Sequence, residues 1–184
     1  AGHIPQSINI GLSGDFAPSV GAFIVDVRQP ILLITEVGKE EESVTRLSRV
    51  GFDNVIGHLK GGFESWKADG KEAESMQRMS AEEFAHVLQK ESPEIYDIRR
   101  ETEYETEHLE DAQNKPLASI NEWIKDIQPT KHFYMHCASG YRTMIASSIL
   151  RARGYHNFTE IEGGINAVRR TDLPKSKFVK TINA

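Results

Sequence analysis

Residues 132–153 read HFYMHCASGYRTMIASSILRAR, and this stretch predicts the fold of the chain. The apolar run from His132 to His136 is typical of a buried strand, and residues 143–153 form an amphipathic helical segment. The cysteine loop, residues 137–142, connects the two. A strand that leads through a short loop into a helix is the unit from which parallel sheets flanked by helices are built, so we expect an α/β fold.

The residues before this stretch continue the alternation of strands and helices. Residues 94–98 form a second short apolar run, and Ser80 with Glu83 makes a capping box ahead of Phe84, which predicts the start of a helix. The segment from about residue 71 to residue 79 is polar, lacks periodicity and suggests a linker. A domain is therefore expected to begin near residue 76.

An internal repeat at an offset near 103 relates the two halves of the chain. Residues 2–12 match 107–117, Gly51 and Phe52 match Gly154 and Tyr155, and Gly61-Gly62 matches Gly163-Gly164. The first half has no counterpart of residues 80–106, which hold one helix and one central strand. We therefore expect a first domain, 1–72, that is truncated at its N-terminal side, and a second domain, 76–184, in a chain excised from a longer protein.

The cysteine loop carries the candidate chemistry. Cys137 lies after a strand and before a helix, where unpaired backbone N–H groups and the positive end of the helix dipole favour a thiolate over a thiol. Arg142 adds a cation, Gly140 permits a tight turn with inward N–H groups, and Ser139 offers a hydroxyl donor. This pattern predicts a nucleophilic cysteine in a cradle for an anion.

Composition narrows the classes of function. The net charge is −5, the stretch 101–111 is strongly acidic, and no apolar run approaches the roughly 20 residues of a membrane span, so we expect neither nucleic acid nor membrane as a partner. One cysteine excludes an intrachain disulfide and fits a reducing, cytoplasmic location. The seven histidines have no shared ligand spacing, so we expect no metal site, and we expect no cofactor.

These motifs resemble the rhodanese (thiosulfate sulfurtransferase) superfamily. The resemblance is carried by a set of short motifs, Asp97-Ile98-Arg99, Glu103-Tyr104, His108-Leu109, Asn114, Pro116-Leu117, the loop CASGYR and the turn Gly163-Gly164. Glu107 departs from the pattern, because the family usually has glycine before the histidine. The tandem resembles, more loosely, the C-terminal part of fusions in which a metallo-β-lactamase-fold persulfide dioxygenase precedes two rhodanese units.

The resemblance implies a sulfurtransferase that moves sulfane sulfur from thiosulfate or a persulfide to a thiol or cyanide. Cys137 would be the catalytic nucleophile and would carry the sulfur as a persulfide. The binding loop for the anionic donor would consist of Ala138, Ser139, Gly140, Tyr141, Arg142 and Thr143. Arg142 would help to hold the loop and attract the donor, and an upstream dioxygenase domain would be a partner.

Other residues receive structural interpretations. Asp97 and Arg99 are expected to pair and fix loops, and His136 is expected to point away from Cys137 because side chains alternate along a strand. The triplet Asp26-Val27-Arg28 falls at the wrong place in the repeat and is interpreted as a coincidence. In the first repeat the loop after the strand from Ile31 is interpreted as about two residues shorter, with Thr35 or Glu36 nearest the position of Cys137.

Two other functions stay open. A phosphatase class shares this fold, but it needs five residues between cysteine and arginine, whereas this loop has four. A non-catalytic sulfur-binding or scaffold module is supported by the first repeat, which has no cysteine, and is opposed by the intact loop of the second.

Overall fold

A computed structural model describes residues 2–13 and 16–177. Residues 178–184, which the predicted second domain includes, lie outside the described residues. The chain divides into two compact units, Ala1–Ser75 and Met76–Ala184, which are described one at a time below.

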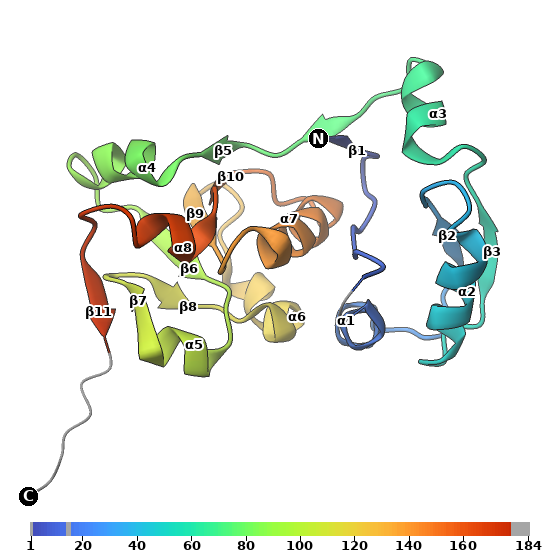
Figure 1. The fold of residues 1–184 in the computed structure, drawn as a ribbon, viewed down its shortest axis with the longest axis horizontal. Coiled ribbons are helices and arrows are strands. Elements are labelled where there is room, and N and C mark those ends of the chain that lie inside the picture. The colour runs from blue at the N-terminus through green and yellow to red at the C-terminus, as the bar shows by residue number, and fades with distance from the viewer. Residues whose placement is uncertain (1, 14–15, 178–184) are drawn as a thin grey trace, which may run out of the picture. The chain divides into compact units, whose positions relative to one another are not determined.

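The second unit is built on a five-stranded sheet in which every neighbouring pair is parallel (Figure 1). Its strand order is β5-β10-β9-β6-β8, with bounds β5 Arg78–Met79, β10 Phe158–Ile161, β9 Phe133–His136, β6 Glu94–Asp97 and β8 Gln113–Asn114. A separate antiparallel pair joins β7, Glu107–Leu109, to β11, Lys175–Lys177. The central strands β9 and β10 are buried along their whole length, as expected for a parallel sheet covered on both faces.

Helices cover both faces of this sheet. The helices are α4 Ala81–Leu88, α5 Glu101–Thr106, α6 Ile120–Trp123, α7 Tyr141–Ala152 and α8 Gly164–Val168, with 3₁₀ turns η1 Leu117–Ser119 and η2 Ile124–Asp126. On one face, Phe84 of α4 and Val168 of α8 share a core with Ile95 and Tyr134. On the other face, the ring of Tyr96 lies 6.4 Å from that of Trp123 in α6.

The predicted elements of this unit are present with small changes at their ends. The capping box is confirmed, because Ser80 Oγ accepts from the N–H of Glu83 and the Glu83 carboxylate accepts from the N–H of Ser80. Helix α7 begins at Tyr141, two residues before the predicted start. The predicted linker, residues 71–79, is wrong at two places, because residues 74–75 pair with residues 2–3 and residues 78–79 form β5, whose backbone pairs with β10.

The first unit has a much smaller sheet. Strands β2, Ile31–Leu33, and β3, Val55–His58, form a parallel pair, and β1, Gly2–His3, pairs antiparallel with β4, Glu74–Ser75. The helices are α1 Phe16–Phe23, α2 Glu40–Ser48 and α3 Gly62–Ala68. Phe16, Val20, Leu47 and Phe52 form its core, whereas Leu32 and Ile56 of the parallel pair are exposed. The expected mainly parallel sheet flanked by helices is thus complete in the second unit and reduced to two strands in the first.

Among residues 2–13 and 16–177, no helix is long and apolar enough to cross a membrane.

Candidate active site

Cys137 directly follows β9, at the carboxyl ends of the parallel strands, and precedes the first turn of α7. Its Sγ accepts a hydrogen bond from the backbone N–H of Gly140 at 3.2 Å, and Thr143 Oγ1 lies 3.9 Å away. Gly140 has a φ of 117°, a conformation that residues with a Cβ rarely adopt. The thiol is 1% exposed, so the cysteine loop wraps around the sulfur and offers it a backbone donor at the N-terminal end of a 12-residue helix.

The double-glycine turn before α8 fixes the strand end that carries Cys137. Gly164 packs so closely that a Cβ placed on it would lie 2.2 Å from the Cys137 carbonyl oxygen. The N–H groups of Ile165 and Asn166 donate to the carbonyls of Cys137 and Ala138, at 2.9 and 3.2 Å. The start of the cysteine loop is therefore held by backbone contacts that need glycine at position 164.

The guanidinium of Arg142 is bound by a carboxylate of the second unit. Its Nη1 and Nη2 donate to the two oxygens of Glu103, in α5, at 2.6 and 2.9 Å. Hydrogen bonding to Arg142 lowers the pKa of Glu103, and the same pair raises the pKa of Arg142. A bidentate partner therefore already matches the charge of Arg142, and this pair joins the cysteine loop to α5.

A buried carboxylate lies beneath the loop. Glu160, in β10, is 2% exposed, and its Oε1 hydrogen-bonds the hydroxyl of Thr143. Its Oε2 lies 2.9 Å from Nε of Arg78, in β5, although the N–H is not directed well enough for a hydrogen bond. Thr143 therefore connects the sulfur of Cys137 to a charged group inside the unit.

Asp97, Arg99 and His136 form a buried polar cluster behind the strand ends. Arg99 donates through Nε and Nη2 to the Asp97 carboxylate and through Nη2 to the Glu107 carbonyl. His136 Nδ1 lies 3.3 Å from the Cys137 carbonyl oxygen, and burial lowers the pKa of His136. The contacts match the structural interpretation of these residues, and His136 meets the backbone of Cys137 instead of its sulfur.

The remaining residues of the predicted binding loop differ in exposure. Ser139 and Tyr141 are exposed, whereas Ala138 is partly buried. Glu107, which departs from the rhodanese pattern, has an extended backbone with a φ of −165°, so no glycine is needed there. Its carboxylate pairs with Nε of Arg169.

The first unit holds Thr35 at the position of Cys137. A Cβ on Gly62 would lie 2.3 Å from the Thr35 carbonyl oxygen, which reproduces the contact between Gly164 and Cys137. Of the two predicted candidates, Thr35 and not Glu36 therefore lies at the position that matches Cys137. The loop between Thr35 and α2, residues 36–39, has four residues, and the loop between Cys137 and α7, residues 138–140, has three, so the prediction that the first repeat has a loop about two residues shorter is wrong.

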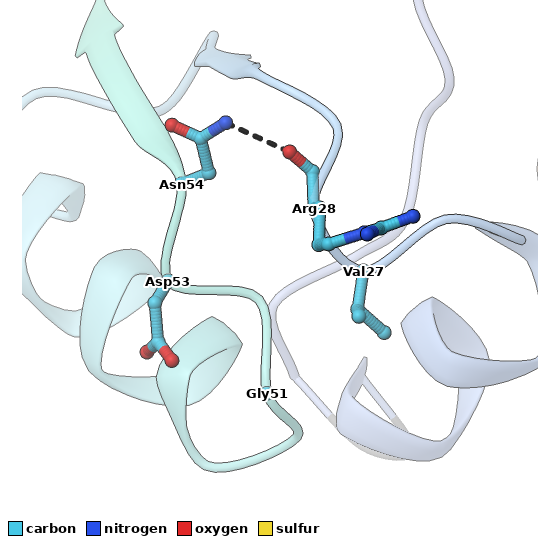
Figure 2. A pocket seen from close by; sticks show the side chains of 5 residues that line it. All are labelled: Val27, Arg28, Gly51, Asp53 and Asn54. Carbon is cyan, nitrogen blue, oxygen red and sulfur yellow. Dashed lines mark hydrogen bonds between the residues drawn. The ribbon is translucent and has the colours of Figure 1, made fainter.

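A hollow in the first unit lies beside the triplet 26–28. Figure 2 shows Val27, Arg28, Gly51, Asp53 and Asn54 around it, with Asn54 Nδ2 donating to the Arg28 carbonyl at 2.8 Å. The triplet forms a turn closed by the N–H of Arg28 donating to Asp26 Oδ1, so its likeness to residues 97–99 does not extend to a strand end. A second hollow, in the second unit, lies between α4 and residues 170–174, and Cys137 lines neither.

Two residues of this site, Glu160 and Arg78, and the role of Glu103 were not predicted from the sequence. A glutamate between Thr159 and Ile161 in an apolar strand was a usable signal, because buried carboxylates need partners. Arg78 gave no signal, since it lies in the segment interpreted as a linker. Glu103 was recognised as part of a motif, but its partner is 39 residues away.

Comparison with known proteins places the chain in a family. The model of the rhodanese-like domain matches residues 1–69 and 80–171. The uncharacterized protein YqhL of Bacillus subtilis is 28% identical over 89 residues, which are 48% of this chain and 69% of YqhL. A tRNA uridine(34) hydroxylase of Buchnera aphidicola is 28% identical over 93 residues, 47% of this chain and 30% of the hydroxylase.

A solved structure has a similar fold. The rhodanese-like domain protein from Staphylococcus aureus superimposes with a TM-score of 0.51 at 23% identity, over 56% of this chain and all of that protein. Family model, fold and cysteine loop agree, and the chain belongs to the rhodanese-like domain family.

Proposed function

We propose that the second unit is a sulfurtransferase that carries sulfane sulfur on Cys137. The observation that carries this proposal is the N–H of Gly140, which donates to Sγ at 3.2 Å at the N-terminal end of α7. A donor in this position stabilises negative charge on sulfur, and thiolate is the nucleophilic form of cysteine. The site therefore favours attack by sulfur on an electrophilic sulfur atom.

The reaction would proceed in two displacements. The Cys137 thiolate attacks the outer sulfur of thiosulfate, so that a new S–S bond forms, the sulfur–sulfur bond of thiosulfate breaks, and sulfite leaves with the electron pair. With a persulfide donor the leaving group is a thiolate. After the persulfide takes up a proton, an acceptor thiolate or cyanide attacks the outer sulfur of Cys137–S–SH, the acceptor–sulfur bond forms, the Cys137 S–S bond breaks, and the Cys137 thiolate leaves.

The proposal assigns distinct roles to the loop residues. Gly140 supplies the donor to sulfur, Thr143 supplies a neighbouring hydroxyl, and Arg142 holds the loop through Glu103. Ser139 and Tyr141 are the exposed residues that an anionic donor would meet first. Since Cys137 is 1% exposed, a donor that ends in a single protruding sulfur fits the loop better than a bulky electrophile.

We also infer that residues 1–72 are a rhodanese-like repeat without a nucleophile and that residues 76–184 are the catalytic domain. The support is the shared glycine contact, with Thr35 in place of Cys137. A threonine hydroxyl cannot hold sulfane sulfur, so the first repeat would serve as a scaffold. An upstream persulfide dioxygenase domain is a proposal that rests on the sequence resemblance. Determining the sequence of the full-length gene product tests it.

The proposal is tested by intact mass after incubation with thiosulfate, with and without a reductant. The chain should gain about 32 Da, one sulfur, and lose it on reduction, whereas Cys137→Ser should gain nothing. The same pair is then incubated with glutathione persulfide. A chain that gains no sulfur from either donor would contradict the proposal.

A further inference from the structure

We propose that Glu160 is a positioning residue that fixes the direction of the Thr143 hydroxyl beneath Cys137 and thereby controls how firmly Cys137 holds sulfur. The inference rests on the proposed function, but its main test reads the thiol itself and does not require sulfur transfer. Glu160 has no part in the displacement steps and does not reach the outer surface.

The single hydroxyl proton of Thr143 has more than one possible acceptor. Its Oγ1 lies 2.8 Å from the Gly140 carbonyl oxygen, within hydrogen-bond distance of Glu160 Oε1 and 3.9 Å from Cys137 Sγ. A hydroxyl has one proton to donate and two lone pairs. An ionised carboxylate only accepts and is the strongest acceptor of the three, so the proton of Thr143 points to Glu160.

The direction of this proton decides what the sulfur meets. With its proton given to Glu160, Thr143 turns a lone pair toward Cys137 and can accept from a thiol, but it cannot donate to a thiolate. The charge of Glu160 acts in the same sense, because a negative neighbour disfavours a thiolate. Both effects work against the Gly140 N–H, which favours the thiolate.

The charge of Glu160 is only partly compensated. Glu160 Oε2 lies 2.9 Å from Arg78 Nε but accepts no hydrogen bond among the described residues. The Arg78 side chain is 41% exposed, so water screens the guanidinium more than it screens the carboxylate. Glu160 therefore leaves a negative potential beneath the loop.

Other charged or titratable groups lie near the sulfur on neighbouring elements and are unchanged by the substitutions below. They are Arg142 of α7 with its partner Glu103 of α5, His136 of β9, and Asp97 of β6 with the following Arg99. Arg142 is matched by Glu103, and Asp97 by Arg99. The charge that reaches the sulfur through a hydrogen-bonded side chain is that of Glu160, which Arg78 compensates only in part.

The consequence for sulfur transfer follows from the states of Cys137. As a free thiolate its sulfur is charged, whereas in Cys137–S–SH the inner sulfur is neutral. When an acceptor thiolate attacks the outer sulfur, the acceptor–sulfur bond forms, the Cys137 S–S bond breaks, and the Cys137 thiolate leaves while the outer sulfur keeps its proton. Glu160 makes this leaving group less stable, so it favours the sulfur-loaded carrier over the empty one.

The first experiment measures the rate of alkylation of Cys137 by iodoacetamide against pH. Glu160→Gln removes the charge and lets an amide N–H donate to Thr143, so the pH midpoint should fall by about one unit, which is about tenfold more thiolate below the midpoint. Glu162→Gln removes the same charge from an exposed position two residues away and should leave the midpoint nearly unchanged. Equal midpoints in the two variants would overturn the proposal.

A second pair of variants tests the same proposal at Thr143 if Glu160→Gln does not fold. Thr143→Val is nearly isosteric and removes the acceptor for the thiol, so the midpoint should fall, while Thr143→Ser should keep it. If the hydroxyl instead donates to the sulfur, Thr143→Val would raise the midpoint, which contradicts the proposal. Circular dichroism of each variant establishes that it is folded.

Sulfur release gives the functional readout. Loaded Glu160→Gln should pass its sulfur to glutathione about threefold faster than the loaded parent chain, because its leaving thiolate is more stable and only part of the charge develops in the transition state. If the parent chain gains no sulfur but the alkylation midpoints shift as expected, the proposed function fails and the role of Glu160 stands. If sulfur is gained but the alkylation midpoints do not move, the proposed function stands and the role of Glu160 fails.

Discussion

Cys137 and Thr35 occupy matching positions after a strand in the two units. Their backbones are packed in the same way, but their side chains and the loops that follow differ. In both units a double-glycine turn brings a glycine so close to the strand end that a Cβ would lie 2.2 or 2.3 Å from its carbonyl oxygen. After Cys137 the loop turns through Gly140 into α7, whose first turn has no acidic residue. After Thr35 the chain enters α2, whose first turn holds Glu40, Glu41 and Glu42.

This difference separates the contacts that stabilise the fold from the groups to which we assign the proposed chemistry. The glycine contact is present in both units, so it belongs to the architecture and does not depend on a cysteine. The donor to sulfur and a helix start free of carboxylates are found together in the second unit, whereas a glycine with positive φ follows three residues after the strand end in both units, as Gly140 and Gly38. Three acidic residues at the start of α2 neutralise the positive end of its helix dipole, so that end is less favourable for binding an anion.

The largest expected effect comes from moving the nucleophile between the units. Thr35→Cys combined with Cys137→Ser should gain no sulfur from thiosulfate, because the acidic first turn of α2 opposes both the thiolate and the anionic donor. Intact mass with and without reductant measures this, with the unchanged chain as the positive control. A reducible gain of one sulfur would show that the strand end alone is sufficient.

Substituting the close glycine should have the next largest effect. Gly164→Ala should lower the free energy of unfolding of the second unit by about 3 kcal/mol or more, because the new Cβ meets backbone that must shift. Gly154→Ala is the matched control, since its φ is also positive but its Cβ would meet open space, and it should cost about 1 kcal/mol. Urea unfolding monitored by Trp123 fluorescence in a Trp66→Phe background measures both.

The same pair of substitutions in the first unit sharpens the comparison. Gly62→Ala should be more destabilising than Gly51→Ala there, for the same reason. If Gly62→Ala and Gly51→Ala cost the same, the likeness of Thr35 and Cys137 would lose its energetic support.

Loss of the carboxylate that holds the cysteine loop should have a moderate effect. Glu103→Gln breaks the pair with Arg142 and should slow sulfur loading about fivefold, since a partly exposed pair contributes about 1 kcal/mol. Glu105→Gln removes an equal charge from an exposed position of the same helix and should change the rate little. A parallel loss in both variants would mean that net charge, and not the anchored loop, sets the rate.

The smallest expected effect is on the pH dependence of stability. Burial lowers the pKa of His136, so its neutral form stabilises the folded state above the ordinary value of about 6.5, and this contribution is lost as the pH falls below that value. Unfolding in urea should therefore require less denaturant at pH 5.5 than at pH 7.5. His136→Asn should flatten this change, and an unaltered slope would exclude His136 as its source.

Local features of the second unit could be predicted from sequence because they depend on neighbouring residues. The capping box of Ser80 and Glu83, the buried run around Phe133 and the helix after Gly140 are each encoded within a few positions. The short strand β5 could not be predicted, because two residues carry no periodicity and Arg78 is in a strand only through its pairing with Glu160.

The sequence by itself determined the candidate nucleophile, the loop that follows it and the resemblance to a family, since these depend on residue type and short spacing. Only the tertiary structure decided what surrounds the sulfur. Arg142 meets Glu103 across 39 positions, and Thr143 meets Glu160 across 17. The physical reason is that neighbouring strands and helices of a parallel sheet come from distant parts of the chain, so the charges that tune a site are set by packing and not by spacing.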